Sequence, residues 1–282
     1  MNGIIVVNKP SGYTSRDIVN IVGKSINTKK VGHTGTLDPM AEGVLVICVN
    51  DATKLVELLT DHEKDYIAEV KLGIKTDTLD ITGTVLEKQT VVLEEKILKE
   101  TLLNFNKTYQ QEVPEYSAVK INGKKMYEYK RAGLEIPNKI YREVTVSNME
   151  LLTFDGDTFK FKCHVSKGTY IRQLISDICY ELGVIGTMSS LLRTSLGNFS
   201  LKDANSIEDI KANHIKMISI NEVLSNYKTI DVDAALYKKI ANGVVYEENI
   251  DDLYIYFTYQ NKPLALYKKH NDNKYHMDKC FK

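Results

Sequence analysis

The loop over Val31–Gly43 carries the residues best suited to chemistry. It contains three glycines, one histidine and the carboxylate of Asp38, which directly precedes Pro39. The proline biases Asp38 away from the α region, so a stiffened loop can present its carboxylate in a cleft. A carboxylate is ionised at neutral pH and can act as a nucleophile. Taken alone, Asp38 could equally be a turn residue bonded to its own backbone, and His33 a structural histidine.

Arginine is scarce, which makes each arginine a candidate for a pairing role. The chain has 37 Lys and Arg residues in all, and its arginines are Arg16, Arg131, Arg142, Arg172 and Arg193. A planar guanidinium can bind a carboxylate through two hydrogen bonds, a geometry that lysine cannot reproduce. Arg172 follows Tyr170 closely, at the start of an expected helix. Taken alone, it could equally be an ordinary surface charge.

Other chemistries have weaker support. Asp77, Asp80 and His33 lack a further ligand at convincing spacing, so we expect no metal site and interpret both aspartates as turn or hydrogen-bonding residues. The sequence has no G-x-G-x-x-G or P-loop pattern, so we expect no nucleotide cofactor. The four cysteines form no C-x-x-C pair, and we expect them to be reduced and packed as small apolar side chains.

The hydrophobic pattern predicts the scaffold that must hold these side chains. Apolar runs and alternation predict strands over Gly3–Asn8, Val44–Val49, Lys64–Gly73, Val144–Leu152 and Thr158–Val165. Helical periodicity predicts helices over Arg16–Ile26 (capped by Ser15), Thr53–Leu59, Leu93–Phe105 and Tyr170–Leu182. Because strands and helices mix without βαβ regularity, we expect an α+β fold with a mixed, largely antiparallel sheet.

The pattern of predicted elements changes near Ser225–Lys228. Beyond this point the sequence predicts a short helix over Ala234–Ala241 and β-rich segments over Leu253–Thr258 and Lys262–Tyr267. We therefore predict two domains, residues 1–227 and residues 228–282.

Composition and charge exclude several classes of protein. The chain has 282 residues, of which 43% are hydrophobic and 26% charged, so it is neither disordered nor a coiled coil. No apolar run approaches the roughly 20 residues that span a bilayer, and no secretory signal is predicted. The formal net charge is zero, yet Val119–Arg142 carries a local excess of five positive charges, with tyrosines interleaved. Such an excess suits a polyanion, although ordinary solvated surfaces also show it.

Taken together, the motifs resemble a known family. They form blocks in one order along the chain, over Asn8–Ser15, Gly32–Leu45, Lys64–Ala68, Leu72–Gly83, Pro114–Glu128, Ser166–Arg172 and Leu191–Phe199. This pattern resembles the bacterial tRNA pseudouridine-55 synthases of the TruB type. Several blocks in register are far more specific than any one of them.

The resemblance implies an isomerase that converts uridine 55 in the T-loop of tRNA to pseudouridine. It implies a pseudouridine-synthase catalytic domain, with an insertion at about 106–142 that closes over RNA, and a C-terminal PUA-like RNA-binding domain. No metal and no other cofactor are expected. The implied partner is the T-stem-loop, or elbow, of tRNA. We expect a cytoplasmic monomer without a membrane contact or an obligatory protein partner.

The resemblance also assigns roles to individual residues. Three residues match catalytic positions. Asp38 matches the nucleophile, and Arg172 matches the arginine paired with it. Tyr66 matches the aromatic that stacks on a flipped-out base and can assist removal of the proton from carbon 5. Whether Asp38 attacks carbon 6 or carbon 1′, or removes a proton from carbon 2′, stays open. The expected substrate-binding residues are His33, Tyr170, Leu191, Lys9, Lys120, Lys124 and Arg131.

Two rival functions are weighed against this one. An RNA-binding module could fold the tRNA elbow without catalysis. Such a module is expected to lack Asp38 or Arg172, and this chain has both residues. A guide-RNA-dependent relative would call for partner-binding extensions, which this chain does not show.

Overall fold

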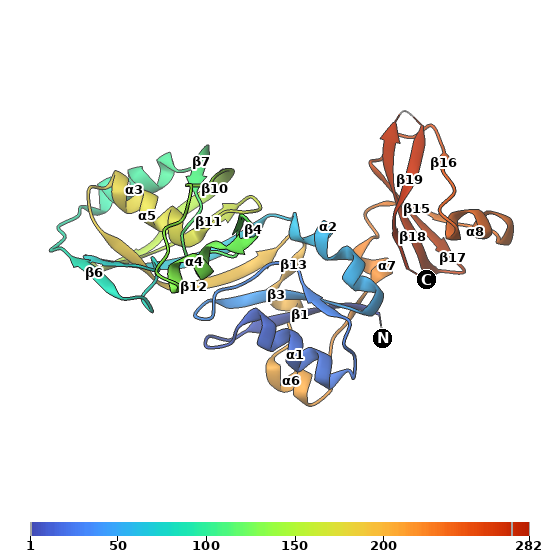
Figure 1. Cartoon of the computed structure of the whole chain (residues 1–282), viewed down its shortest axis with the longest axis horizontal. Helices are drawn as coiled ribbons and strands as arrows, with labels where there is room; N and C mark the ends of the chain where they lie inside the picture. The colour runs from blue at the N-terminus through green and yellow to red at the C-terminus, as the bar shows by residue number, and fades with distance from the viewer. Residues whose placement is uncertain (1, 272, 282) are drawn as a thin grey trace.

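One large sheet organises the first 220 residues of the computed structural model, which describes residues 2–271 and 273–281 (Figure 1). The strand order is β14-β1-β3-β12-β4-β11-β10-β7, with β2 paired to β3 and β13 to β12. The pair β3–β12 is parallel and the others are antiparallel. The strands are β1 (Gly3–Lys9), β2 (Val31–His33), β3 (Glu42–Val49), β4 (Lys64–Leu72), β7 (Thr108–Glu112), β10 (Tyr141–Phe154), β11 (Thr158–Val165), β12 (Gly186–Leu196), β13 (Phe199–Ser200) and β14 (Ile218–Ser219). The expected α+β fold with a mixed, largely antiparallel sheet is confirmed.

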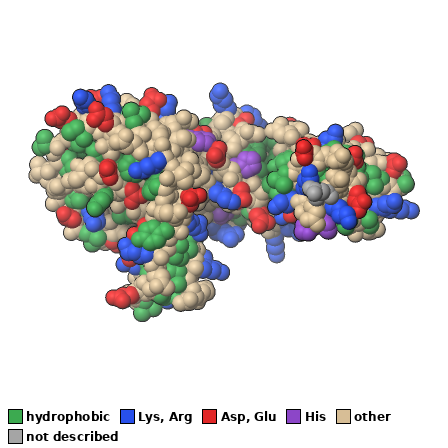
Figure 2. All heavy atoms as spheres, turned by 90° about the horizontal axis from the view of Figure 1, so that it is seen from above, with side chains coloured by type: hydrophobic (Ala, Val, Ile, Leu, Met, Phe, Trp, Pro, Cys, Tyr) green, Lys and Arg blue, Asp and Glu red, His purple; other side chains and the backbone are tan. Residues whose placement is uncertain are grey.

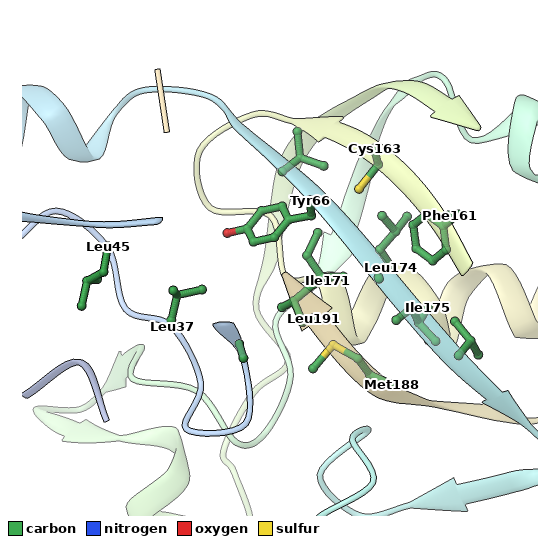
Figure 3. Close-up of a cluster of buried hydrophobic side chains, with 14 of the residues drawn as sticks. Leu37, Leu45, Tyr66, Phe161, Cys163, Ile171, Leu174, Ile175, Met188 and Leu191 are labelled. Atoms are coloured by element: carbon green, nitrogen blue, oxygen red, sulfur yellow. The ribbon is translucent and has the colours of Figure 1, made fainter. Parts of the chain in front are cut away.

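Helices cover this sheet with apolar faces. They are α1 (Ser15–Ser25), α2 (Val56–Thr60), α3 (Glu95–Asn104), α5 (Ile171–Glu181), α6 (Ile207–Lys211) and α7 (Ile220–Val223), with 3-10 turns η1 (Asn50–Leu55) and η2 (Leu201–Asp203). Helix α5 buries a stripe at helical spacing, made of Ile171, Leu174, Ile175 and Ile178. At roughly 1.5–3 kcal/mol for each buried side chain, this stripe docks the helix against the sheet. Figure 3 shows the contact with β4 and β12.

Local signals predicted β1, β3, β4, β10, β11, α1, α3 and α5. They missed β12, which carries Leu191 and Arg193, because two β-bulges interrupt its alternation. They also missed the short strands β2, β7, β13 and β14, and β2 lies within the predicted loop Val31–Gly43. Thr14, and not Ser15, caps α1, because Thr14 shares a capping box with Asp17. The Ser15 hydroxyl instead bonds the backbone of Leu37. The predicted helix Thr53–Leu59 is divided between η1 and α2.

Two further small sheets lie beside the large one. Strands β5 (Ile74–Thr76) and β6 (Val85–Lys88) form a hairpin. Strands β8 (Lys120–Ile121) and β9 (Lys124–Lys125) form another, followed by α4 (Met126–Arg131). The second hairpin and α4 belong to the segment that leaves the large sheet after Glu112 and returns at Tyr141, the two residues that pair. We call residues 113–140 the insertion.

The C-terminal residues form a separate curled sheet. Its order is β15-β17-β18-β19-β16, from strands β15 (Lys228–Asp231), β16 (Tyr246–Glu247), β17 (Tyr254–Tyr259), β18 (Lys262–Asn271) and β19 (Lys274–Cys280), with helix α8 (Ala234–Ala241) beside them. This is the small β-rich, PUA-like domain that the sequence predicts. Sequence periodicity missed β15, β16 and β19. The exact limits 1–227 and 228–282 stay a prediction, and Met1, Asp272 and Lys282 within them lie outside the described residues.

Charges of both signs share one face of the molecule. On the face that Figure 2 shows, acidic and basic side chains are interspersed over the whole length of the molecule. Across residues 2–271 and 273–281, no helix is both long enough and apolar enough to cross a membrane.

Candidate active site

A pocket of about 900 Å³ opens where the loop before β3 meets β4, β12 and the start of α5. Segments far apart in the sequence meet there, from residue 33 to residue 193. The pocket is lined by six of the residues that the sequence singled out: His33, Asp38, Tyr66, Tyr170, Arg172 and Leu191. The sequence-predicted centre is therefore a single cavity.

Asp38 and Arg172 form a two-pronged ion pair at this cavity. Arg172 Nε lies 2.9 Å from Asp38 Oδ2, and its Nη2 lies 3.3 Å from Oδ1. The Arg172 side chain is 8% exposed, whereas that of Asp38 is 33% exposed. The guanidinium thus holds the carboxylate in one orientation while the carboxylate still faces the pocket.

Backbone carbonyls also bind the guanidinium and hold it in place. Arg172 Nη1 donates to the Thr78 carbonyl at 2.9 Å, and Nη2 donates to the Tyr116 carbonyl at 3.1 Å. The carboxylate of Asp80 lies 3.8 Å from Nη1. A buried arginine with this many partners has little freedom, so Asp38 meets a preorganised cation.

The loop that carries Asp38 is anchored on both sides of the carboxylate. Leu37 is buried, and its N–H donates to Ser15 Oγ at 2.9 Å. On the other side, Ala41 N–H donates to the Asp38 carbonyl at 3.0 Å and closes a turn. These contacts confirm that Asp38 sits on a stiffened loop.

Lys9 takes a different place from the one predicted. It is fully buried, and its Nζ donates to the carbonyls of Pro10, Tyr13 and Pro39 at 2.9, 2.7 and 3.1 Å. Burial lowers the pKa of Lys9 to about 8. Lys9 therefore ties strand β1 to the loop after Asp38, and its ammonium does not line the pocket. The expectation of a direct substrate contact is wrong, because the loop folds over this side chain.

Tyr66 extends from β4 toward the loop that carries Leu37 (Figure 3). It belongs to the buried face of an alternating strand, as predicted. Its hydroxyl lies 3.5 Å from Nη1 of Arg193. Leu191, which lines the same pocket, lies on the neighbouring strand β12.

Arg193 is a site residue to which sequence reasoning assigned no role. It is 1% exposed, and it donates from Nε to the Val44 carbonyl at 2.6 Å and from Nη2 to the Gly35 carbonyl at 3.2 Å. It thus joins β12, β3 and the Asp38 loop. Gly43, with φ of +101°, permits this approach, since a Cβ there would come within 2.2 Å of the Arg193 carbonyl. The scarcity of arginine was the available signal.

His33 stands at the pocket wall, where its surroundings disfavour the charged form of its ring. Burial, together with the nearby Arg16 and Arg193 guanidinium groups, lowers the pKa of His33. Its Nδ1 accepts the Gly35 N–H at 3.3 Å. An uncharged ring of this kind can pack on a base.

Basic groups that the sequence analysis did not assign surround the pocket mouth. Arg142 and Lys167 line it, and Lys167 pairs with Asp61 at 2.8 Å. Burial and the charge of Arg193 lower the pKa of Lys64 to about 8.

The remaining predicted RNA contacts lie outside the pocket, on the insertion. Lys120 is exposed. The ammonium of Lys124 lies 4.8 Å from the ring centre of Tyr129, and the guanidinium of Arg131 lies 5.3 Å from that of Tyr127. These three cations lie on β8, β9 and α4, and we call them together the insertion patch.

The two aspartates considered for a metal site act as turn and hydrogen-bonding residues, and Asp80 also lies beside Arg172. Asp80 accepts hydrogen bonds from Thr78 and Thr82, and Asp77 accepts from Thr84 and Tyr116.

Comparison with known proteins places this arrangement in a family. Residues 24–171 match the family described as TruB family pseudouridylate synthase (N terminal domain). A tRNA pseudouridine synthase B of Clostridium kluyveri is 40% identical and covers 96% of this chain and 93% of its own length. One of Alkaliphilus oremlandii is 44% identical, over 86% of this chain and 82% of its own.

This chain belongs to the TruB family of pseudouridylate synthases. As a family member, the protein is an isomerase. Solved structures show the same fold for this TruB-family chain. A chain of an archaeal box H/ACA sRNP Nop10-Cbf5 complex superposes with a TM-score of 0.69 at 21% identity, over 100% of this chain and 86% of that one. A chain of a Cbf5-Nop10-Gar1 complex gives a TM-score of 0.73 at 22% identity, over 99% and 85%.

Proposed function

We propose that this TruB-family protein is a tRNA pseudouridine synthase that isomerises uridine 55 in the T-loop, with Asp38 as the nucleophile. The observation that carries the proposal is the Asp38 carboxylate, held by two guanidinium nitrogens of buried Arg172 and facing a pocket of about 900 Å³. That volume accepts a flipped-out nucleotide. The relatives named tRNA pseudouridine synthase B support tRNA as the substrate.

The reaction balances without an external reactant. The N1–C1′ bond of uridine breaks, the base rotates, a C5–C1′ bond forms, carbon 5 loses a proton and N1 gains one. Asp38 supplies the nucleophile, and its attack on carbon 6 or carbon 1′, or proton removal from carbon 2′, are the three routes open to a carboxylate. Tyr66 would hold one face of the base, and His33 and Leu191 would form pocket walls.

RNA binding would use surfaces outside the pocket. The insertion patch, with Arg142 and Lys167 at the mouth, would meet phosphates, and the region at about 106–142 would close over the RNA. The C-terminal domain, residues 228–282, would contact the acceptor-stem side of tRNA. We propose that the protein works as a monomer in the cytoplasm, without an obligatory protein partner.

The test measures tritium release from a T-stem-loop RNA labelled at carbon 5 of uridine 55. We expect release by the wild type and a loss of about 10³-fold or more in Asp38→Asn, equivalent to about 4 kcal/mol of transition-state stabilisation. RNA affinity should be retained, because the substitution keeps the size of the side chain. Arg172→Lys should lower turnover more than affinity, since one ammonium cannot replace the two-pronged pair.

The same assay separates the rival function. A module that folds the tRNA elbow without catalysis would bind the RNA and release no tritium. Undiminished turnover in Asp38→Asn would show that the nucleophile is another group.

A further inference from the structure

A buried glutamine on β7 is bonded to the segment that carries Arg172. Gln111 is 1% exposed. Its Oε1 accepts the Tyr170 N–H at 2.8 Å, and its Nε2 donates to the Tyr170 carbonyl at 3.2 Å. Because the Tyr170 N–H can only donate, these contacts fix which end of the amide is oxygen. One side chain thus binds both backbone groups of one residue.

Tyr170 is the residue from which α5 begins. It occupies the N-cap position, and in the described chain its side chain makes no capping hydrogen bond. Its carbonyl also accepts the Leu174 N–H at 2.9 Å, the first turn of the helix. Gln111 therefore fixes the start of α5 from outside the helix, and Arg172 is two residues farther on.

Gln111 also stands at the root of the insertion. It lies one residue before Glu112, where the chain leaves the large sheet. The Tyr170 side chain packs against the insertion's own apolar cluster, formed by Val113, Ile121 and Met126. The insertion touches Arg172 as well, through the Tyr116 carbonyl.

A second layer of polar contacts holds the glutamine. Gln111 Nε2 also donates to Tyr109 Oη at 3.0 Å, and that hydroxyl donates to Asp177 Oδ2 at 2.9 Å. Tyr109 lies on β7 and Asp177 on α5, so the network joins the same two elements.

We propose that Gln111 is a positioning residue for catalysis: its buried amide fixes Tyr170 against the root of the insertion and so sets the geometry of the Asp38–Arg172 pair. The inference rests on the proposed function of that pair. A guanidinium displaced by about 1 Å would meet Asp38 poorly, and errors of that size cost rate and not binding.

Gln111→Glu tests this with an almost isosteric change. The carboxylate still accepts the Tyr170 N–H, but when ionised it has no proton for the Tyr170 carbonyl or for Tyr109. Once protonated, it regains a donor. The charged and titratable groups around it are Tyr109 and Glu112 on its own strand, Asp177 on α5, Arg142 on β10 and Lys107 over the Tyr109 ring. The wild type is therefore measured at every pH as the reference.

Single-turnover rates on the T-stem-loop RNA are compared from about pH 5.5 to about pH 8. At the upper end we expect Gln111→Glu to be about 10- to 100-fold slower than wild type at an unchanged dissociation constant, and the gap to narrow toward acid pH. Asn20→Asp is the control, because it makes the same change from an amide to a carboxylate. Asn20 is exposed in the middle of α1, so this variant should follow the wild type throughout.

Two further variants complete the test. Gln111→Met keeps the length of the side chain without its bonds, and it should be slow at every pH with affinity retained, which decides the matter even if Gln111→Glu unfolds. Tyr109→Phe leaves both bonds to Tyr170 in place and should lose only a few fold.

The inference is overturned if both Gln111 variants match the wild-type rate. It is also overturned if rates fall only in proportion to the folded fraction, or if affinity falls while the rate is kept. A wild type that releases no tritium would overturn the proposed function and this inference together, whereas an active wild type with equally active Gln111 variants would overturn the inference alone.

Discussion

At the scale of single residues, the site depends on how differently two charged partners are solvated. Arg172 is nearly enclosed and bound by backbone carbonyls, whereas a third of the Asp38 side chain is exposed. The cation therefore stays fixed while the carboxylate remains accessible to a base or a sugar. This asymmetry suits a nucleophile, because the group that reacts must be reached and the group that orients it must not move.

Lys9 is a charged residue with a structural role, because its buried ammonium binds backbone carbonyls. Lys9→Met would leave the Pro10 and Tyr13 carbonyls without that donor. We expect a loss of about 1–3 kcal/mol in the free energy of unfolding at pH 7, measured by urea unfolding. Lys96→Met is the control, since Lys96 is an exposed lysine of α3.

The same lysine gives a pH dependence with a defined sign. The folded pKa is about 8 and the unfolded value about 10.4, so between these values the unfolded chain binds more protons. The free energy of unfolding of the wild type should therefore rise with pH, relative to Lys9→Met, from about pH 8 to about pH 10. A flat or falling difference would contradict the burial of the ammonium.

At the scale of elements, the insertion separates binding from chemistry. Its patch of Lys120, Lys124 and Arg131 lies outside the pocket, while its Tyr116 carbonyl touches Arg172. Changes on the patch should therefore alter affinity for RNA, and changes at the root of the insertion should alter rate.

Reversal of charge on the patch tests this separation. Lys120→Glu/Lys124→Glu should weaken binding of the T-stem-loop about tenfold or more at low salt and reduce the slope of log K against log salt by about one to two. The rate at saturating RNA should stay within a few fold. The control is Lys96→Glu/Lys99→Glu on exposed positions of α3. Equal weakening in both variants would mean that only overall charge matters.

At the scale of the whole molecule, the C-terminal sheet is packed onto the large sheet. Tyr256, Leu266 and Phe281 share one buried cluster with Ile4 and Leu55. Lys54 Nζ donates to the Cys280 carbonyl across the same boundary. The two parts are therefore in fixed contact, and the second would extend the RNA-binding surface at a set position.

Removal of residues 229–282 should have two effects. The melting temperature should fall, because the apolar cluster becomes exposed, and affinity for full tRNA should fall more than affinity for the T-stem-loop. Chemistry on the T-stem-loop should persist, since the pocket lies wholly within residues 33–193. A folded, truncated protein with full affinity for tRNA would contradict the proposed role of this domain.

The sequence by itself determined the features that depend on neighbouring residues. Alternation fixed β4 with Tyr66, helical spacing fixed α5, and the Asp38–Pro39 step put the carboxylate on a stiff loop. Hydrophobic periodicity and the backbone restriction by proline both act over a few residues. They can therefore be recognised from the sequence alone. The resemblance supplied the pairing of Asp38 with Arg172, and their contact confirms it.

Only the tertiary structure decided where the ends of long polar side chains go. The buried Lys9 joins β1 to the loop after Asp38, and Arg193 joins β12 to β3. Gln111 binds the residue from which α5 begins. Each of them bonds a backbone group that lies between 30 and 149 positions away along the chain. Which carbonyls are left unpaired at such distances depends on how strands and loops pack, and no local pattern encodes that.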